Sequence, residues 1–169
     1  MAQNSLGLIE LTSIAAGFQT CDAMLKAANV DLVLSRSICS GKYMVMVRSA
    51  SRFSVIDSFV IPNLHESVFP AISGASKVEE LEALGIVESF SVASLIEGAD
   101  AAVKAANVQL IEIRLAMALG GKAFVTLTGN VAAVQSAVDA GAQVVGQKGM
   151  LVNKVVIPHP RPELLTEMI

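Results

Sequence analysis

The residue with the most distinctive chemical setting in this chain is Cys39, within the stretch RSICSGKYMVMV (residues 36–47). It lies in a small polar turn that precedes Lys42 and an apolar, strand-like run; the turn consists of Ser37, Ile38, Cys39, Ser40 and Gly41. A nearby lysine favours the thiolate, the form of cysteine that binds metals. One thiolate is too few to hold a metal ion, and no histidine stands near it in the sequence to make it a nucleophile. From the residues alone, an incidental free thiol therefore remains the alternative.

The other titratable residues do not form a catalytic constellation. Glu10 and Glu88 fall on equivalent predicted strands, but no second group stands ready to act as their acid or base partner. His65 and His159 each follow a Val-Ile-Pro sequence, without a second histidine or a carboxylate pair at metal-ligand spacing. We therefore expect no enzymatic activity.

Two further features have plain structural interpretations. The turn at Leu119, Gly120 and Gly121 precedes a lysine as phosphate-binding loops do, but it lacks the full P-loop spacing. Cys21 lies on a predicted helix stripe with Phe18, Leu25 and Ala28, which indicates a small residue that fills the core.

Composition limits the classes of function. The 169 residues are 53% hydrophobic and only 16% charged, with a net charge of -3 and no basic stripe for nucleic acid. No stretch has the roughly 20 apolar residues of a membrane span, and the N-terminus does not read as a secretory signal. With two cysteines, a reducing cytosol is the expected setting. The low charge predicts that other subunits cover much of the surface.

The chain contains a tandem duplication. GLIELTSIAAGFQTCDAMLKAANVDLVL, beginning at Gly7, matches GIVESFSVASLIEGADAAVKAANVQLIE, beginning at Gly85, at an offset of 78. A two-residue insertion moves the offset to 80, which aligns Gly41 with Gly121. We predict a first domain with its connector over residues 1–78 and a second domain over residues 79–169.

The second repeat predicts the order βαββαβ, a ferredoxin-like α/β (α+β) arrangement with both helices on one face of the sheet. Apolar residues recur at helical spacing after Val92, and Gly129 and Asn130 provide a cap for a second helix. The predicted strands cover residues 85–90, 108–114, 122–128 and 150–157.

The first repeat lacks the second helix. Only 11 residues separate Arg48 from Val60, whereas 27 separate the equivalent Thr128 from Val156. Losing that helix exposes one face of the first sheet. Either a neighbour covers this face, or the encoded protein carries a stretch that this sequence omits, which the abrupt junction SASRFS favours.

The repeated GLIELTSIAAGFQTCDAMLKAANV segment, the Gly-Lys strands and the VIP and HPRP sequences resemble the tandem-domain class of bacterial microcompartment shell proteins over nearly the full length. This resemblance implies a homotrimer whose six similar domains form a flat pseudohexagonal tile in the shell of an organelle within the bacterial cytoplasm. Other shell proteins are the implied partners. The turns before the two Gly-Lys strands would line the central pore.

The resemblance also implies a cofactor. One member of the class holds an iron–sulfur cluster in its pore through one cysteine from each subunit. The implied site here is a [4Fe–4S] cluster, one per trimer, with Cys39 as the ligand from each chain, since such clusters normally bind four thiolates and three nearly suffice. Electron transfer across the shell, or cluster exchange with luminal redox enzymes, would follow. Ser40 replaces a proline of that member, so we expect a looser turn.

The family's tile-edge residues map onto Lys26, Lys104 and Arg161. The plain alternative for the two lysines is a solvated helix end. Two other functions stay open: a shell tile whose pore passes metabolites without a cluster, and a ferredoxin-like sensor that binds a small ligand between its domains.

Overall fold

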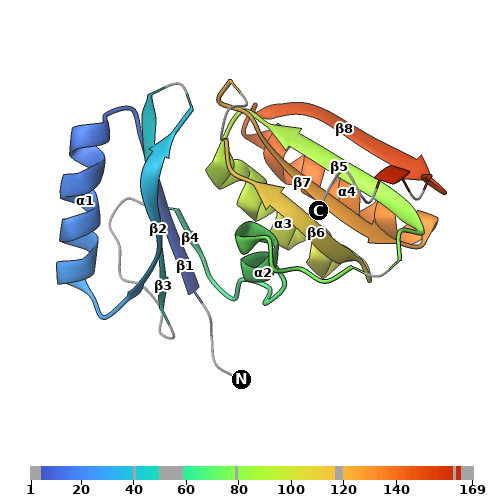
Figure 1. Ribbon diagram of the computed structural model, residues 1–169, viewed down its shortest axis with the longest axis horizontal. Coiled ribbons are helices and arrows are strands. Elements are labelled where there is room, and N and C mark those ends of the chain that lie inside the picture. The colour runs from blue at the N-terminus through green and yellow to red at the C-terminus, as the bar shows by residue number, and fades with distance from the viewer. Residues whose placement is uncertain are drawn as a thin grey trace. The chain divides into compact units, whose positions relative to one another are not determined.

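The computed structural model describes residues 5–39, 41–49, 59–78, 80–116, 120–161 and 163–164 (Figure 1). The chain forms two compact units, Met1–Leu64 with Met117–Gly121, and His65–Ala116 with Lys122–Ile169. Residues 65–78, which follow the first repeat in the sequence, therefore group with the second unit. Among the described residues, no helix combines the length and apolar composition needed to span a bilayer.

The first unit is a four-stranded antiparallel sheet with one helix on one face (Figure 1). Its strand order is β2-β3-β1-β4. In chain order the elements are β1 (Ser5–Leu11), α1 (Ile14–Ala27), β2 (Asp31–Ile38), β3 (Lys42–Ser49) and β4 (Phe59–Ile61).

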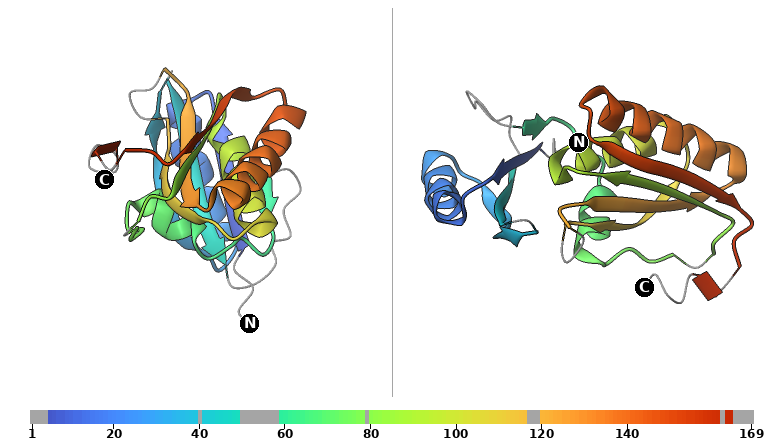
Figure 2. Two further views of the ribbon diagram at one scale, coloured as in Figure 1. Left: turned by 90° about the vertical axis from the view of Figure 1, so that its right-hand side faces the viewer. Right: turned by 90° about the horizontal axis from the view of Figure 1, so that it is seen from above.

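The second unit repeats this sheet with the order β6-β7-β5-β8 and carries α3 and α4 on the same face (Figure 2). The predicted βαββαβ arrangement is confirmed, with bounds shifted by one or two residues. Its elements are α2 (Val68–Ser73), β5 (Ala83–Ser89), α3 (Val92–Ala105), β6 (Gln109–Arg114), β7 (Ala123–Gly129), α4 (Val131–Gln147) and β8 (Leu151–Pro158).

Polar contacts hold α4 at its N-terminus and near its middle. The side chain of Asn130 accepts a hydrogen bond from the backbone N–H of Ala133 at 2.8 Å, as the predicted cap requires. Lys154 on β8 contacts Asp139 of α4 at 2.5 Å, and this lysine lowers the pKa of the aspartate. Its ion pair therefore joins the helix to the edge strand of the sheet.

Helices α3 and α4 cross in close contact at two glycines. A Cβ placed on Gly98 would lie 3.0 Å from the carbonyl oxygen of Gly141, and one placed on Gly141 would lie 2.8 Å from that of Gly98. Side chains at these positions would push the helix axes apart. The crossing therefore depends on both glycines and helps to bury nine residues of α3.

Helix α1 has the same length as α3 but buries only Gly17 and Cys21. The cluster of Cys21 with Tyr43, Val45 and Val47 confirms the predicted core role of this cysteine. The predicted buried stripe is wrong for Phe18 and Leu25, which are 64% and 39% exposed, and for Ala28, which is also exposed.

The physical reason for this exposure is that no described element lies over this side of α1, whereas the segment from His65 through α2 packs against the equivalent side of α3. Residues 50–58, which contain most of the SASRFS junction, lie outside the described residues. The gap between β3 and β4 is too short for a helix of the 17 residues seen in α4.

The two repeats fill the space between first helix and sheet with opposite combinations of residue size. A Cβ on Gly17 would lie 2.2 Å from the Tyr43 ring, so the small helix residue makes room for a large strand residue. At the equivalent positions of the second repeat, Leu95 and Ala123 are both fully buried. The combined volume is thus kept although both residues differ, as compensated core changes require.

We predict that the pair Gly17 and Tyr43 is thermodynamically coupled. Gly17→Leu overpacks the core and should cost about 1–3 kcal/mol, less the gain from removing a helix-interior glycine. Tyr43→Ala opens a cavity and should cost about 3 kcal/mol or more. The double variant restores the Leu95 and Ala123 combination, so urea unfolding should show a favourable coupling of about 1–3 kcal/mol. Strictly additive costs would contradict this compensation.

Candidate functional site

The turn between β2 and β3 presents Cys39 at the end of the first unit's sheet. Ile38 pairs with Lys42 across the two strands, and Cys39 follows directly as a partly buried residue. Gly41 has φ +71°, the left-handed conformation that glycine adopts without strain, and nothing lies within 4 Å of where its Cβ would be. Ser40, predicted to belong to this turn, lies outside the described residues.

Lys42 is held by a carboxylate on the neighbouring strand. Its Nζ lies 2.8 Å from Oε1 of Glu10 on β1, with the Glu10 side chain 15% exposed. The same pair recurs in the second unit, where Nζ of Lys122 lies 2.8 Å from Oε1 of Glu88. The two glutamates thus each bind the lysine that begins the Gly-Lys strand, a cross-strand pairing that sequence analysis did not identify. The shared presence of Glu and Lys in both repeats was the available signal.

In the second repeat, the equivalent turn has Leu119 and Gly120 at the positions of Cys39 and Ser40, while Gly121 aligns with Gly41. Gly120 and Gly121 have φ +62° and +88°, and they lead directly to Lys122 before β7. Leu119, also predicted for this turn, lies outside the described residues. The two turns therefore occupy equivalent places in the fold, and only one of them supplies a thiol.

The described part of the chain contains no group of three or more His, Cys, Asp or Glu side chains arranged to hold a metal ion. Cys21 is buried under α1, whereas Cys39 is at the turn. One copy of the chain can therefore offer a single turn thiol, and any cluster at this turn needs thiols from further copies.

The predicted edge lysines occupy equivalent places near the ends of their helices. Lys26 contacts Asp22 at 2.6 Å, and Lys104 contacts Asp100 at 2.5 Å, each four residues earlier. The Lys26 side chain is 75% exposed and that of Lys104 is 42% exposed. Both ammonium groups thus lie at the surface in the same geometry.

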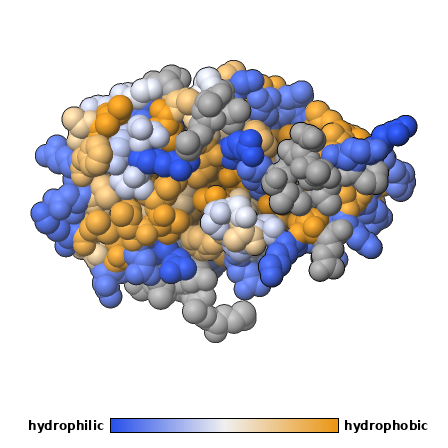
Figure 3. All heavy atoms as spheres, viewed as in Figure 1, coloured by the Kyte–Doolittle hydropathy of each residue, from blue (hydrophilic) through white to orange (hydrophobic). Residues whose placement is uncertain are grey.

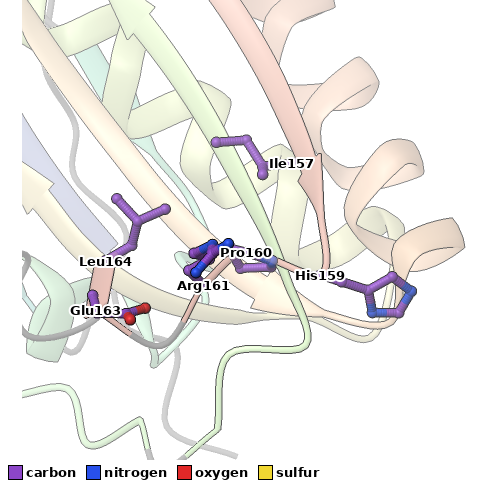
Figure 4. Close-up of a pocket in the computed structure, with 6 residues that line it drawn as sticks. All are labelled: Ile157, His159, Pro160, Arg161, Glu163 and Leu164. Carbon is purple, nitrogen blue, oxygen red and sulfur yellow. The ribbon is translucent and has the colours of Figure 1, made fainter.

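The remaining predicted residues lie after the last strand of each repeat. Arg161 is exposed beyond β8, in a surface pocket where Glu163 and Leu164 lie on one side and His159 points away (Figure 4). Nδ1 of His65 lies 2.8 Å from the hydroxyl oxygen of Ser67, a local contact that orders the loop before α2.

We predict that the two thiols differ in reactivity. In iron-free protein, Ellman's reagent should modify Cys39 at least about tenfold faster than Cys21, because the buried thiol reacts only after local opening. Cys39→Ser should remove the fast phase, and the control Cys21→Ala should keep it. Equal rates in the folded wild-type protein would contradict the placement of the two cysteines.

Comparison with known proteins is consistent with this duplicated fold. The BMC domain family matches residues 5–55 and 83–160. The bacterial microcompartment shell protein PduT of Citrobacter freundii is 42% identical over 179 aligned positions, covering 98% of this chain and 97% of that protein. The aligned length exceeds the 169 residues of this chain, so that relative has residues without an equivalent here.

Shorter relatives match about half of the chain. The bacterial microcompartment shell protein EutM of Salmonella typhimurium is 42% identical over 84 positions, covering 50% of this chain and 85% of that protein. Among solved structures, a microcompartment protein of Desulfitobacterium hafniense has a TM-score of 0.87 and 47% identity, covering 98% of this chain and 99% of that one. The likeness to that structure and to PduT therefore includes both repeats.

Proposed function

The chain belongs to the BMC-domain family of microcompartment shell proteins, and on this premise we propose that it is a structural protein of a bacterial microcompartment shell whose trimer binds one iron–sulfur cluster. The observation that carries the cluster proposal is the position of Cys39, at the turn before the Gly-Lys strand of the first unit only. Three copies contribute three such turns.

The duplicated architecture supports a trimeric tile. Each chain supplies two similar sheet units, so three chains in cyclic symmetry provide six units around one axis. The six turns before β3 and β7 then alternate around the axis between those with Cys39 and those with Leu119 at the equivalent position. Other shell proteins are the partners at the rim of such a tile.

The donor set at the turn suits a [4Fe–4S] cluster shared by three chains. Such clusters are normally held by four cysteine thiolates, so three copies of Cys39 would supply three and leave one iron for water or another ligand. Glu10 holds the ammonium of Lys42 beside the turn, which fixes the start of β3 next to the thiol. When bound, the cluster supplies one-electron redox chemistry, which suits electron transfer across the shell or exchange with luminal redox enzymes.

The surface lysines support a role in contacts between tiles. Lys26 and Lys104 repeat one geometry in both units, with each ammonium held by an aspartate one helical turn earlier. Arg161 is exposed after β8, whereas the equivalent His65 donates its backbone N–H to Asp100. We assign all three residues to the tile edge.

Cys39→Ser should give a folded, colourless trimer, because each cluster loses all three protein thiolates at once. Cys21→Ala, the matched control, should keep the colour and lose at most a few kcal/mol of stability, since it only removes a small buried group. The measurements are iron content, visible absorption and paramagnetic resonance after anaerobic purification. A Cys39→Ser trimer that kept its iron and absorption would overturn the cluster and leave the shell tile.

The oligomer and its edges are tested together. Sedimentation should show a trimer for the wild-type protein, and a stable monomer or dimer would contradict the tile.

Lys26→Ala should leave this trimer intact and weaken the formation of extended sheets, seen by electron microscopy, because the Lys26 side chain is 75% exposed and lies outside the core. Loss of the trimer in Lys26→Ala would show that the edge assignment is wrong.

A further inference from the structure

One side of α1 carries an exposed apolar stripe formed by Ile14, Phe18 and Leu25. These side chains are 43%, 64% and 39% exposed, although one part of the Phe18 ring contacts the Tyr43 ring, with the ring centroids 4.8 Å apart. Hydrophobic side chains reach the surface over the first unit (Figure 3). The spacing of four and seven residues places the three on one side of the helix, away from Thr20 and Met24, which are equivalent to Gly98 and Ala102 where α3 meets α4. The stripe is therefore a second uncovered surface, separate from the place of the missing helix.

The equivalent side of α3 is fully packed. Val92, Ile96 and Val103, at the matching positions, are 0%, 0% and 8% exposed. Asp100 continues this stripe one turn after Ile96, and its Oδ1 accepts the backbone N–H of His65 at 2.8 Å. The segment that begins at His65 thus reaches α3 on this side.

That segment includes α2, which packs against both β6 and α3. Within it, Val68 and Ala71 are completely buried. The segment follows the first repeat in the sequence but belongs to the second unit by its contacts. The segment that follows the last strand of the first repeat therefore covers the first helix of the second repeat.

The chain beyond β8 starts with the same local structure. Asn63 and His159, each directly after the Val-Ile-Pro sequence, both have positive φ, at 57° and 49°. Five residues further, the N–H of Val68 donates to the carbonyl of His65 at 3.1 Å, and that of Leu164 donates to the carbonyl of Arg161 at 3.0 Å. The described residues Arg161, Glu163 and Leu164 thus repeat the start of the segment that begins at His65.

The two equivalent segments differ in burial. Val68 is completely buried, whereas Leu164 is 40% exposed beside Arg161 and Glu163 (Figure 4). The sequence repeats the apolar spacing of α2, since Leu164, Leu165 and Met168 align with Val68, Phe69 and Ile72. Leu164 and the stripe on α1 are therefore two exposed apolar surfaces in the described part of the same chain.

We propose that residues 161–169 of one copy of this chain pack along α1 of a second copy and cover the stripe of Ile14, Phe18 and Leu25. Leu164 takes the place that Val68 has beside α3. The backbone N–H of Arg161 donates to Asp22, as that of His65 donates to Asp100. Asp22 already holds Lys26 through Oδ2, the atom by which Asp100 holds Lys104, so its carboxylate has the matching orientation. This contact rests on the proposed trimer and names the segments that join its chains.

Opposite charges on the two sides of the contact provide the test. Leu164→Glu and Phe18→Lys should each weaken the trimer at least about tenfold in dissociation concentration, measured by sedimentation, because each places an unpaired charge in an apolar contact. The double variant should recover part of this loss. Met150→Glu, at a side chain of similar exposure (38%), is the control and should leave the trimer unchanged.

Hydrogen exchange shows which helix the Leu164→Glu substitution affects. In the wild-type trimer, peptides covering α1 should be protected, and Leu164→Glu should remove this protection, while α3 stays protected in both because α2 covers it within the chain. A wild-type trimer that Leu164→Glu leaves intact, with α1 exchange unchanged, would overturn the contact and keep the shell function. A monomeric wild-type protein would instead overturn the trimer and the contact together.

Discussion

The contact on which the second unit depends is the close crossing of α3 and α4 at Gly98 and Gly141. A helix that lies on a sheet buries only one of its sides there, and its flanks must be covered by other elements. Helix α4 covers one flank of α3 through the two glycines, and α2 approaches the other flank, where Asp100 accepts the His65 N–H. With sheet, α4 and α2 in place, nine of the fourteen residues of α3 are buried.

The first unit shows what remains when only the sheet contact is present. Helix α1 is capped by Ser13 and packs through Gly17 against the Tyr43 ring, so its inner side is as well fitted as that of α3. Within the described ranges no element covers either flank of α1, and the helix buries two residues. The difference between α1 and α3 therefore comes from neighbours and not from helix propensity, since their lengths and caps match.

Much of this fold could be predicted from the sequence because the duplication is direct. The offsets of 78 and 80 aligned the strands and helices, and the apolar spacing after Val92 and the Asn130 cap located α3 and α4 correctly. The exposure of Phe18 and Leu25 could not be predicted, because periodicity shows that a side of a helix is apolar but not which element covers it. The Glu10 and Lys42 pair was missed because the strand register that joins them is set across β1 and β3, far apart in the sequence.

The proposed role of Cys39 follows from a difference between the two repeats. Both units keep the lysine and its glutamate beside the turn, so this ion pair belongs to the shared fold and not to a cysteine site. Only the first repeat has a thiol there, whereas the second has Leu119 at the equivalent position, followed by two glycines with positive φ. In the proposed ring of six units, alternate turns would then bring three thiols and three leucines towards the axis. A duplicated chain would thereby limit the ring to three thiols, which fits the proposed threefold site, whereas six copies of one cysteine-bearing domain would bring six.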